Sequence, residues 1–378
     1  MDNLTHSLFA LTLARSPLGR AGRGTTATLL LASNAPDIDI VTTAAGAISY
    51  LKWHRGPTHG PLGMLALGIM TAGLVWGGRY VLDRRRSAAQ ATATANIDPD
   101  APFAMLVAVA LIGVVLHVLM DLPTSYGTRV LSPFDWHWFA VDWMPIVDIY
   151  LLMMLLAGSL GFGRPSPAVR RTKATVVLTL MAANYGLRGY AHRQALELVP
   201  KIFGPTLAAW CDPSDSRHHP IDSWPRTTVP SPPPEGERCL VDVAALPTFG
   251  SPFQWRIVAQ YSNAYEIRDI DLLDGRFRDS DVEDEAPWRL TLRYPNVWTP
   301  TVLQAARTHL GQVFLGFSRF PAARSAVDAQ GATAVRWTDM RFTGAVVPGE
   351  RALAQSRLFT AVVRIDASGR VISESLGR

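Results

Sequence analysis

The residues best suited to chemistry lie between Trp53 and His59, where the chain reads Trp-His-Arg-Gly-Pro-Thr-His. Proline cannot continue a regular helix, so Gly56-Pro57 makes this stretch a loop. A loop can direct His54 and His59 towards one point. Arg55 lies between them, and its planar guanidinium suits a phosphate, a carboxylate or, less specifically, a phospholipid headgroup. The stretch therefore predicts a site for a metal ion, an anion or both.

Two further pairs lie beside apolar stretches. His117 and Asp121 are four residues apart, so a helix directs both side chains the same way. Asp37 and Asp39 flank one residue, and carboxylates so close repel each other unless a cation or a donor lies between them. Each pair alone also fits a simpler role, as a hydrogen bond at a helix end or as solvated residues at a helix terminus. The argument for a metal site depends on the pairs meeting in space.

Together with a histidine near the N-terminus, these side chains form one candidate set of metal ligands: His6, Asp37, Asp39, His54, His59, His117 and Asp121. Imidazole and carboxylate donors suit zinc, manganese or iron. We therefore expect a divalent metal cofactor, zinc before manganese or iron, and a hydrolytic reaction of the kind such ions support. The Gly-x-Ser-x-Gly sequence of serine hydrolases does not occur.

Long apolar stretches must position these residues. Charged residues make up 18% of the 378 residues, below the ~25% of an ordinary soluble protein. Four stretches are apolar and long enough to be predicted as membrane-spanning helices, namely 60–82, 102–120, 143–163 and 174–190. Two shorter stretches, 4–14 and 25–35, predict a helical hairpin packed within the same bundle.

Arginine-rich segments give this bundle an orientation. The positive-inside rule places segments 15–23, 84–86 and 164–173 in the cytoplasm. Every candidate ligand then lies on the outer face of the inner (plasma) membrane, and so does the C-terminal half. Cys211 and Cys239 could pair there, because the outside is oxidising. The net charge of +5 thus marks membrane topology, and we expect membrane lipids, not nucleic acid, as partners.

The expected fold is a mainly α polytopic membrane helical bundle followed by a smaller β-rich (α+β) soluble domain. The bundle covers residues 1–195, a Pro-rich linker covers 196–238, and the β-rich, extracytoplasmic domain covers 239–378. Alternating or β-branched runs predict a mainly antiparallel sheet, with one helix near 299–309 and strands at 239–244, 253–261, 265–272, 313–317, 334–342 and 358–365.

Several motifs resemble those of the YdjM/YbcI family of membrane-bound, predicted metal-dependent hydrolases: Met-Asp-Asn-Leu-Thr-His-Ser at 1–7, Pro-Asp-Ile-Asp at 36–39, His-Arg-Gly-x-Thr-His at 54–59, His-x-x-x-Asp at 117–121 and Thr-Ser-Tyr-Gly-Thr at 124–128. The resemblance covers about residues 1–190. It implies metal or active-site roles for the seven candidate ligands and, less directly, for Asp142 and Asp148. Pro57 and Gly60 depart from the family pattern, which changes the loop and removes no ligand.

These features lead us to expect a membrane hydrolase that cleaves a phosphoester of a lipid or of an envelope component. A more distant likeness to zinc-dependent phospholipase C points to the same bond. In this mechanism Arg55 stabilises the negative charge that develops on the phosphoryl group, and Asp142 accepts a proton. A transporter or a non-catalytic metal-binding membrane protein is the alternative, and the substrate and the oligomeric state stay open.

Overall fold

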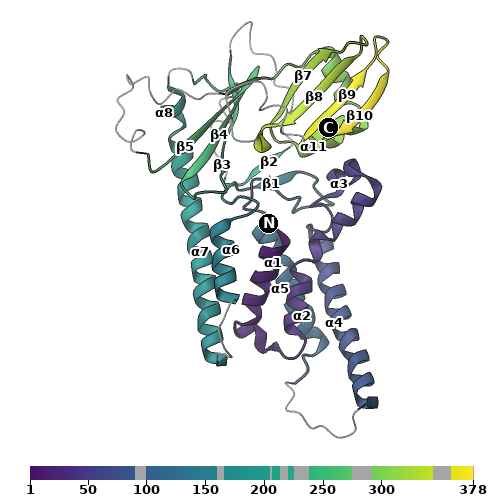
Figure 1. Cartoon of the computed structure of the whole chain (residues 1–378), viewed down its shortest axis with the longest axis vertical. Coiled ribbons are helices and arrows are strands. Elements are labelled where there is room, and N and C mark those ends of the chain that lie inside the picture. The colour runs from purple at the N-terminus through teal and green to yellow at the C-terminus, as the bar shows by residue number, and fades with distance from the viewer. Residues whose placement is uncertain are drawn as a thin grey trace. The chain divides into compact units, whose positions relative to one another are not determined.

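The computed structural model describes residues 1–89, 99–159, 166–204, 207–212, 220–224, 238–274, 292–343 and 359–377. The chain forms two compact units. The first comprises Met1–Val41, Trp53–Ala140 and Met144–Leu187, and the second comprises Thr42–Lys52, Val141–Trp143 and Arg188–Arg378. The first unit is helical and the second contains the larger sheets (Figure 1). About half of the predicted linker over 196–238 lies outside the described residues.

The first half of the chain forms these elements: α1 (Asn3–Ala14), η1 (Pro17–Ala21), α2 (Thr25–Ala32), η2 (Ala35–Ala45), α3 (Ala47–Trp53), α4 (Pro61–Ala89), α5 (Phe103–Asp121), β1 (Trp138–Ala140), α6 (Ile149–Ser159) and α7 (Pro167–Glu197). Local sequence sets several of their ends. The Asp2 carboxylate accepts hydrogen bonds from the backbone and hydroxyl of Thr5 and so caps α1. Pro36 follows the end of α2, where a proline stops an α-helix.

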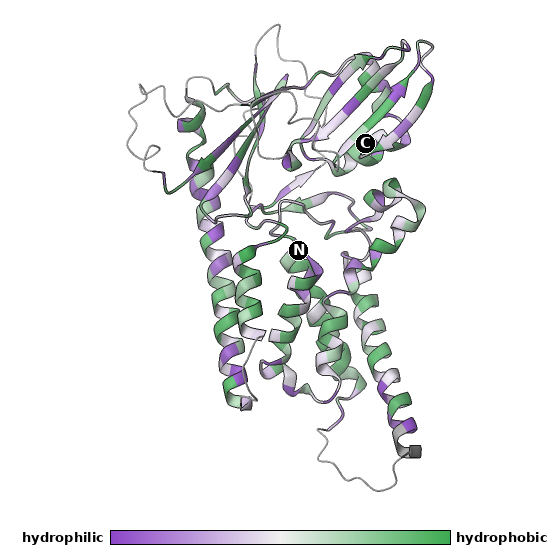
Figure 2. Ribbon diagram, in the orientation of Figure 1, coloured by the Kyte–Doolittle hydropathy of each residue, from purple (hydrophilic) through white to green (hydrophobic). Residues whose placement is uncertain are grey.

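Among the described helices, two are long and apolar enough to cross a membrane: Pro61–Arg85 within α4, and α5. Both are coloured mainly as hydrophobic in Figure 2. Large apolar side chains of α5 remain exposed at Met105, Ile112, Val115 and Leu119. Their spacing places them on one face of the helix, as expected for a face that contacts lipid.

The other two predicted spans are not among these candidates. The stretch 143–163 contains α6, whose 11 residues are too few to cross a bilayer. The stretch 174–190 lies within α7, where Asn184 and Arg188 interrupt the apolar sequence. A multi-pass arrangement beyond α4 and α5 therefore stays a prediction.

Helix α2 packs closely against α5, and this contact fixes the position of the end of α2. At Gly113 of α5, an added Cβ would lie 2.9 Å from the Cβ of Ala32, so only glycine allows this approach. Leu106, Ala110 and Val114 fill the same interface and are fully buried. The C-terminal end of α2 is thereby held beside the last two turns of α5.

The second unit is built on two four-stranded antiparallel sheets, with strand orders β3-β4-β5-β6 and β10-β9-β8-β7. Its elements are α8 (Val199–Phe203), β2 (Asp222–Trp224), β3 (Leu240–Pro247), β4 (Gln254–Tyr261), β5 (Ala264–Asp271), β6 (Leu292–Pro295), α10 (Pro300–Ala306), α11 (His309–Phe317), β7 (Pro321–Val327), β8 (Thr333–Asp339), η6 (Met340–Phe342), β9 (Thr360–Ile365) and β10 (Val371–Leu376). A disulfide joins Cys211 to Cys239, the pair considered from the sequence.

One predicted strand is wrong. Residues 313–317 belong to helix α11, because Leu310, Phe314 and Phe317 recur at helical spacing and are all buried. Thr308 caps this helix by accepting a hydrogen bond from the Gly311 backbone, 3.1 Å away. A short apolar run fits a buried strand and a buried helix equally well. The capping residue Thr308 was the sequence signal that could have identified a helix.

Candidate metal centre

Four candidate ligands meet in the first unit. Ligand atoms of Asp37, His59, His117 and Asp121 all lie within 4.8 Å of one another. Asp37 comes from η2, His59 from the loop before α4, and the other two from the end of α5. His59, His117 and Asp121 are buried, whereas the Asp37 side chain is 13% exposed. The structure thus brings together residues that are up to 84 positions apart.

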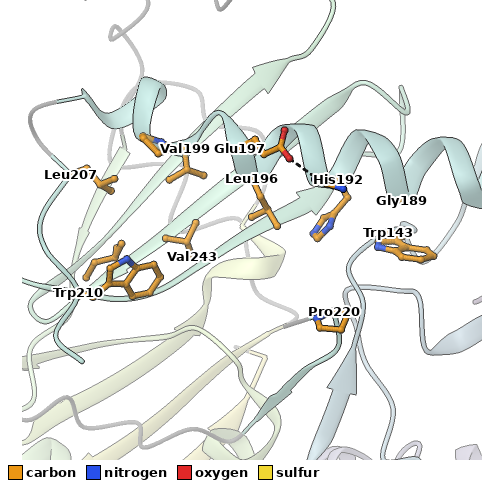
Figure 3. Close-up of a pocket in the computed structure, with 13 residues that line it drawn as sticks. Trp143, Gly189, His192, Leu196, Glu197, Val199, Leu207, Trp210, Pro220 and Val243 are labelled. Atoms are coloured by element: carbon orange, nitrogen blue, oxygen red, sulfur yellow. Dashed lines mark hydrogen bonds and ion pairs between the residues drawn. The ribbon is translucent and has the colours of Figure 1, made fainter. Parts of the chain in front are cut away.

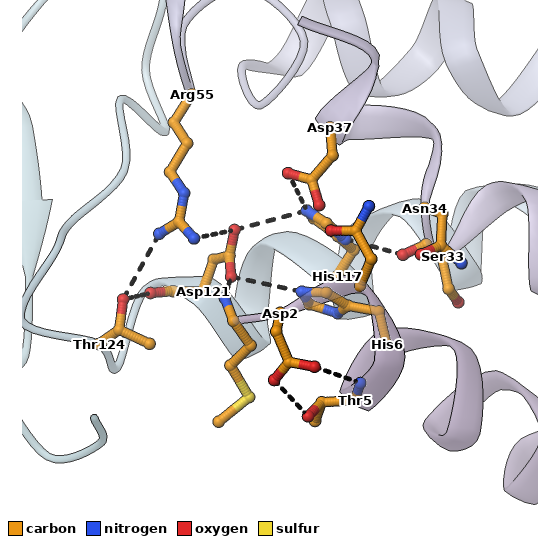
Figure 4. Close-up of polar contacts among 12 residues, drawn as sticks. Asp2, Thr5, His6, Ser33, Asn34, Asp37, Arg55, His117, Asp121 and Thr124 are labelled. Atoms are coloured by element: carbon orange, nitrogen blue, oxygen red, sulfur yellow. Dashed lines mark hydrogen bonds and ion pairs between the residues drawn. The ribbon is translucent and has the colours of Figure 1, made fainter. Parts of the chain in front are cut away.

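His117 presents a defined nitrogen to this cluster. Its Nδ1 lies 2.8 Å from the carbonyl oxygen of Ser33, at the end of α2. A carbonyl oxygen can only accept a hydrogen bond, so the ring proton is on Nδ1, which donates the hydrogen bond to Ser33. The neutral ring then has its lone pair on Nε2, which lies 3.3 Å from His59 Nε2 and faces Asp37 and Asp121. Figure 4 shows the two carboxylates beside the His117 ring. A histidine that binds a metal through one ring nitrogen typically donates a hydrogen bond from the other, and this bond fixes the orientation of the ring.

His59 presents its Nε2 to the same point. That atom lies 3.3 Å from His117 Nε2 and 3.5 Å from an Asp121 oxygen, while Nδ1 contacts the Thr58 hydroxyl at 3.0 Å. Burial lowers the pKa of the His59 imidazole well below its usual range, and His117 lowers it further. The ring is therefore neutral near pH 7, the form that binds metal.

The spacing of the donors fits a metal ion. Four tetrahedral ligands bound at about 2.0–2.1 Å are about 3.3 Å from one another. Here Asp37 Oδ1 lies 3.6 Å from His117 Nε2 and 4.0 Å from His59 Nε2, and Asp121 Oδ2 lies 3.4 Å from His117 Nε2. Burial raises the pKa of the Asp37 carboxyl. A cation bound beside it would lower that pKa and favour the ionised form. Two imidazoles and two carboxylates suit zinc, manganese or iron.

Arg55 extends from the loop to the edge of this cluster. Its guanidinium lies 3.2 Å from Asp121 Oδ2, donates to the Gly127 carbonyl at 3.0 Å and lies over the Tyr126 ring. Arg55 adopts a left-handed backbone conformation with φ of 49°, which is uncommon for a residue with a side chain. Such conformations persist where surrounding contacts fix them, often at functional sites.

Asp39 supplies one of those contacts. Its carboxylate accepts a hydrogen bond from the Arg55 backbone N–H at 2.6 Å and lies 3.2 Å from His54 Nδ1. On the other side, the Arg129 N–H donates to the Arg55 carbonyl at 3.0 Å. Asp39 and His54 thus form a separate pair beside the four-residue cluster. In this geometry they position the loop, and the ligand role predicted for them stays a prediction.

His6 lies against the cluster without completing it. Its ring stacks on His117 with centroids 3.9 Å apart, and its Nε2 lies 3.4 Å from Asp121 Oδ1. Neither ring nitrogen makes a hydrogen bond with the residues that the structure describes. The Met1 amino group also contacts Asp121. His6 belongs to the N-terminal part of α1, the helix that Asp2 caps.

Asp142 and Asp148 have other surroundings. Asp142 belongs to the second unit, where the Arg319 guanidinium donates to it at 2.6 Å and to Asp222 at 2.9 Å. Asp148 accepts a hydrogen bond from the Leu151 backbone at 2.7 Å at the start of α6. Neither is among the four clustered residues. The Asp142 carboxylate is bound to Arg319, and the proton-accepting role predicted for it stays a prediction.

Sequence reasoning missed the residues that orient the ligands. Ser33 acts through its backbone carbonyl, for which side-chain type gives no signal. Tyr126 and Gly127 contact Arg55 and lie in the Thr-Ser-Tyr-Gly-Thr motif, so that motif was the available signal.

Comparison with known proteins places this geometry in context. Residues 1–195, which include all four clustered residues, match a family model described as YdjM inner membrane protein. The Bacillus subtilis protein described as "Uncharacterized protein YfhP" is 26% identical over 150 residues, which are 39% of this chain and 40% of that relative. The chain thus matches about two fifths of the relative's length. No solved structure matches.

The first prediction separates ligands from positioning residues. His59→Ala should lower bound metal at least about tenfold, because losing even an outer partner of a ligand costs that much. His54→Ala should keep its metal, since His54 contacts Asp39. Metal per chain, measured by mass spectrometry of purified protein, checks both. The exposed His137, which pairs with Asp135, gives the control His137→Ala. Equal metal loss in His54→Ala and His59→Ala would identify His54 as a ligand.

The second prediction concerns Asp142. Arg319→Met leaves a buried carboxylate without its cation and should reduce the free energy of unfolding by about 3 kcal/mol or more. Arg370→Met, at a guanidinium that is 85% exposed, should change it little. Thermal unfolding of the two variants gives the comparison. An Asp142→Asn protein with unchanged Tm and no hydrolytic activity would instead support the proton-accepting role.

Proposed function

Because this chain belongs to the YdjM inner membrane protein family, we propose that it is a membrane-bound hydrolase that uses a divalent metal ion. One observation carries the proposal: two imidazoles and two carboxylates from three separate segments converge within 4.8 Å. The Arg55 guanidinium and the Met1 amino group already lie against Asp121. A metal ion would in addition bind the Nε2 lone pair of His117 and the Asp37 carboxylate, which these cations leave pointing into the cluster. The cluster is therefore better explained by ion binding than by packing.

Asp37, His59, His117 and Asp121 would hold the ion. Such an ion supplies Lewis acidity and a hydrolytic nucleophile at neutral pH. Ser33 fixes the His117 tautomer, and Asp39 fixes the loop that carries Arg55. The chain's own contribution is thus a preorganised donor set, which requires little rearrangement when substrate binds.

Arg55 favours a phosphoester as the substrate. A guanidinium binds phosphoryl oxygens through two parallel hydrogen bonds, and this one lies at the edge of the cluster, 3.2 Å from Asp121. In hydrolysis, water adds to phosphorus, the bond to the leaving oxygen breaks, and negative charge grows on the phosphoryl oxygens. Arg55 would stabilise that charge.

Exposed apolar residues beside the cluster favour a lipid or another amphiphilic envelope component. Ile38, Ile40 and Val41 follow Asp37 and are 50%, 60% and 64% exposed, and Leu4 near His6 is 54% exposed. Exposed apolar residues grouped at a site commonly mark contact with lipid or with an apolar partner. The proposed substrate is a phosphoester with an apolar portion.

A structural role for the metal is the second candidate. Its support is the burial of His59, His117 and Asp121, whose side chains are 0% exposed. Structural sites are closed, whereas catalytic sites keep a position open. An ion in this role would tie η2, the loop before α4 and α5 together without turnover.

We also propose that the C-terminal unit lies outside the cytoplasm. The Cys211–Cys239 disulfide supports this, because disulfides persist in oxidising compartments. The arginine-rich segments give the same orientation.

The third prediction tests this orientation. Alkaline phosphatase fused after the last residue should be active in cells, because it folds only where disulfides form. A green fluorescent protein fusion at the same place should be dark. An inactive phosphatase fusion with a bright fluorescent fusion would reverse the proposed topology.

The fourth prediction tests the reaction. Purified protein with zinc or manganese should cleave a phosphodiester or a phospholipid, and His117→Ala should abolish turnover. Arg55→Lys keeps the charge and loses the planar fork, so kcat should fall about 100-fold, as for loss of one oxyanion donor, while bound metal stays unchanged. Release of phosphate or of the alcohol is the measurement, with His137→Ala as control. No turnover, together with a lower Tm after metal removal, would favour the structural role.

A further inference from the structure

The second unit contains a cavity of about 660 Å³ that the proposed reaction does not use. It lies between the last turns of α7, helix α8, residues 207–210 and strand β3 (Figure 3). Its volume is typical of a small-molecule pocket. A space of this size can hold a small molecule.

The lining of this cavity is chiefly aliphatic and aromatic. Leu196, Val199, Leu207 and Val243 contribute alkyl groups, and Trp143 and Trp210 contribute indole rings. In Figure 3 several of these side chains point towards a common space. Removing such a surface from water is favourable by about 25 cal/mol for each Å² of apolar area buried. An apolar ligand would bury that surface.

The charged residues at the cavity are engaged with each other. Arg193 Nε lies 2.9 Å from Glu197 Oε1, and these side chains are 79% and 52% exposed. They face solvent at the rim and neutralise one another. The His192 ring contacts the Trp255 ring, with centroids 5.4 Å apart. The lining therefore offers an apolar interior with polar groups at its edge, which matches one hydrocarbon chain with a head group left outside.

Covalent and backbone contacts hold one wall in place. The disulfide joins Cys211, next to Trp210, to Cys239, the residue before strand β3. The Cys211 N–H donates to the Leu240 carbonyl, and the Leu240 N–H donates to the Ala209 carbonyl, both at 2.8 Å. A wall fixed in this way gives a preformed pocket, which binds without the cost of ordering itself.

We propose that this cavity binds a single hydrocarbon chain of a membrane amphiphile. Family membership places the protein at a membrane, where such chains are abundant. The proposal is independent of the metal centre, because every residue that lines the cavity belongs to the second unit.

The test uses the full-length protein in lipid nanodiscs and a palmitate analogue with a diazirine near the end of its chain. Light should attach the probe to peptides that carry Leu196, Trp210 or Val243, as mapped by mass spectrometry. Labelling should saturate, fall when excess palmitate is added and persist after metal removal. Labelling confined to the exposed faces of α4 and α5, or labelling that never saturates, would overturn the proposal.

Matched variants make the test specific. Leu196→Asp places a carboxylate in the cavity and should reduce cavity labelling at least about fivefold, since a buried charge costs several kcal/mol. Leu273→Asp, at a leucine of the same unit that is 67% exposed, should leave labelling unchanged. Should Leu196→Asp unfold, Gly189→Leu serves instead. An added Cβ at Gly189 would lie 3.2 Å from the Trp143 ring, so a leucine there would occupy space in the cavity. Unchanged labelling in a folded cavity variant would contradict the proposal.

Discussion

Burial of the Asp121 carboxylate is the constraint on which the first unit depends. An uncompensated buried charge costs several kcal/mol, so donors and cations must surround it. Two cations lie against it, the Arg55 guanidinium from the loop before α4 and the amino group of Met1. The Nε2 atoms of His6, His59 and His117 lie 3.4, 3.5 and 3.4 Å from its oxygens. A divalent ion among these groups would compensate the carboxylates most fully. Helix α1 and the loop before α4 therefore cannot move freely relative to α5, because both contact the same buried carboxylate.

Residues in neighbouring segments set the positions of the side chains around Asp121. Gly113 allows α2 to approach α5, and the Ser33 carbonyl at the end of α2 then fixes the orientation of His117. In the loop, Asp39 binds the backbone N–H of Arg55 and holds a left-handed conformation that would otherwise be unfavourable. Small residues, backbone carbonyls and a helix cap thus determine where the functional side chains point.

The second unit is stabilised by different means. Its core is formed from the faces of antiparallel strands and includes fully buried Trp255 and Trp337. Arg319 is buried among Asp142, Asp222 and Asp242. The Cys211–Cys239 disulfide restricts the unfolded chain and so reduces the conformational entropy that is lost on folding. Each unit thus has its own means of burial, so the metal centre and the apolar cavity can be tested separately.

The sequence alone determined the features that depend on spacing along the chain. The four-residue separation of His117 and Asp121, the helix-breaking Gly56-Pro57 and the apolar stretches of α4 and α5 all led to the observed local structure, because helical periodicity and proline sterics act over a few residues. Only the tertiary structure decided between similar neighbours. Asp37 joins the cluster whereas Asp39 binds Arg55, Asp142 binds Arg319, and residues 313–317 are helical. The physical reason is that two carboxylates, or two short apolar runs, are locally equivalent until residues distant in sequence pack against one of them.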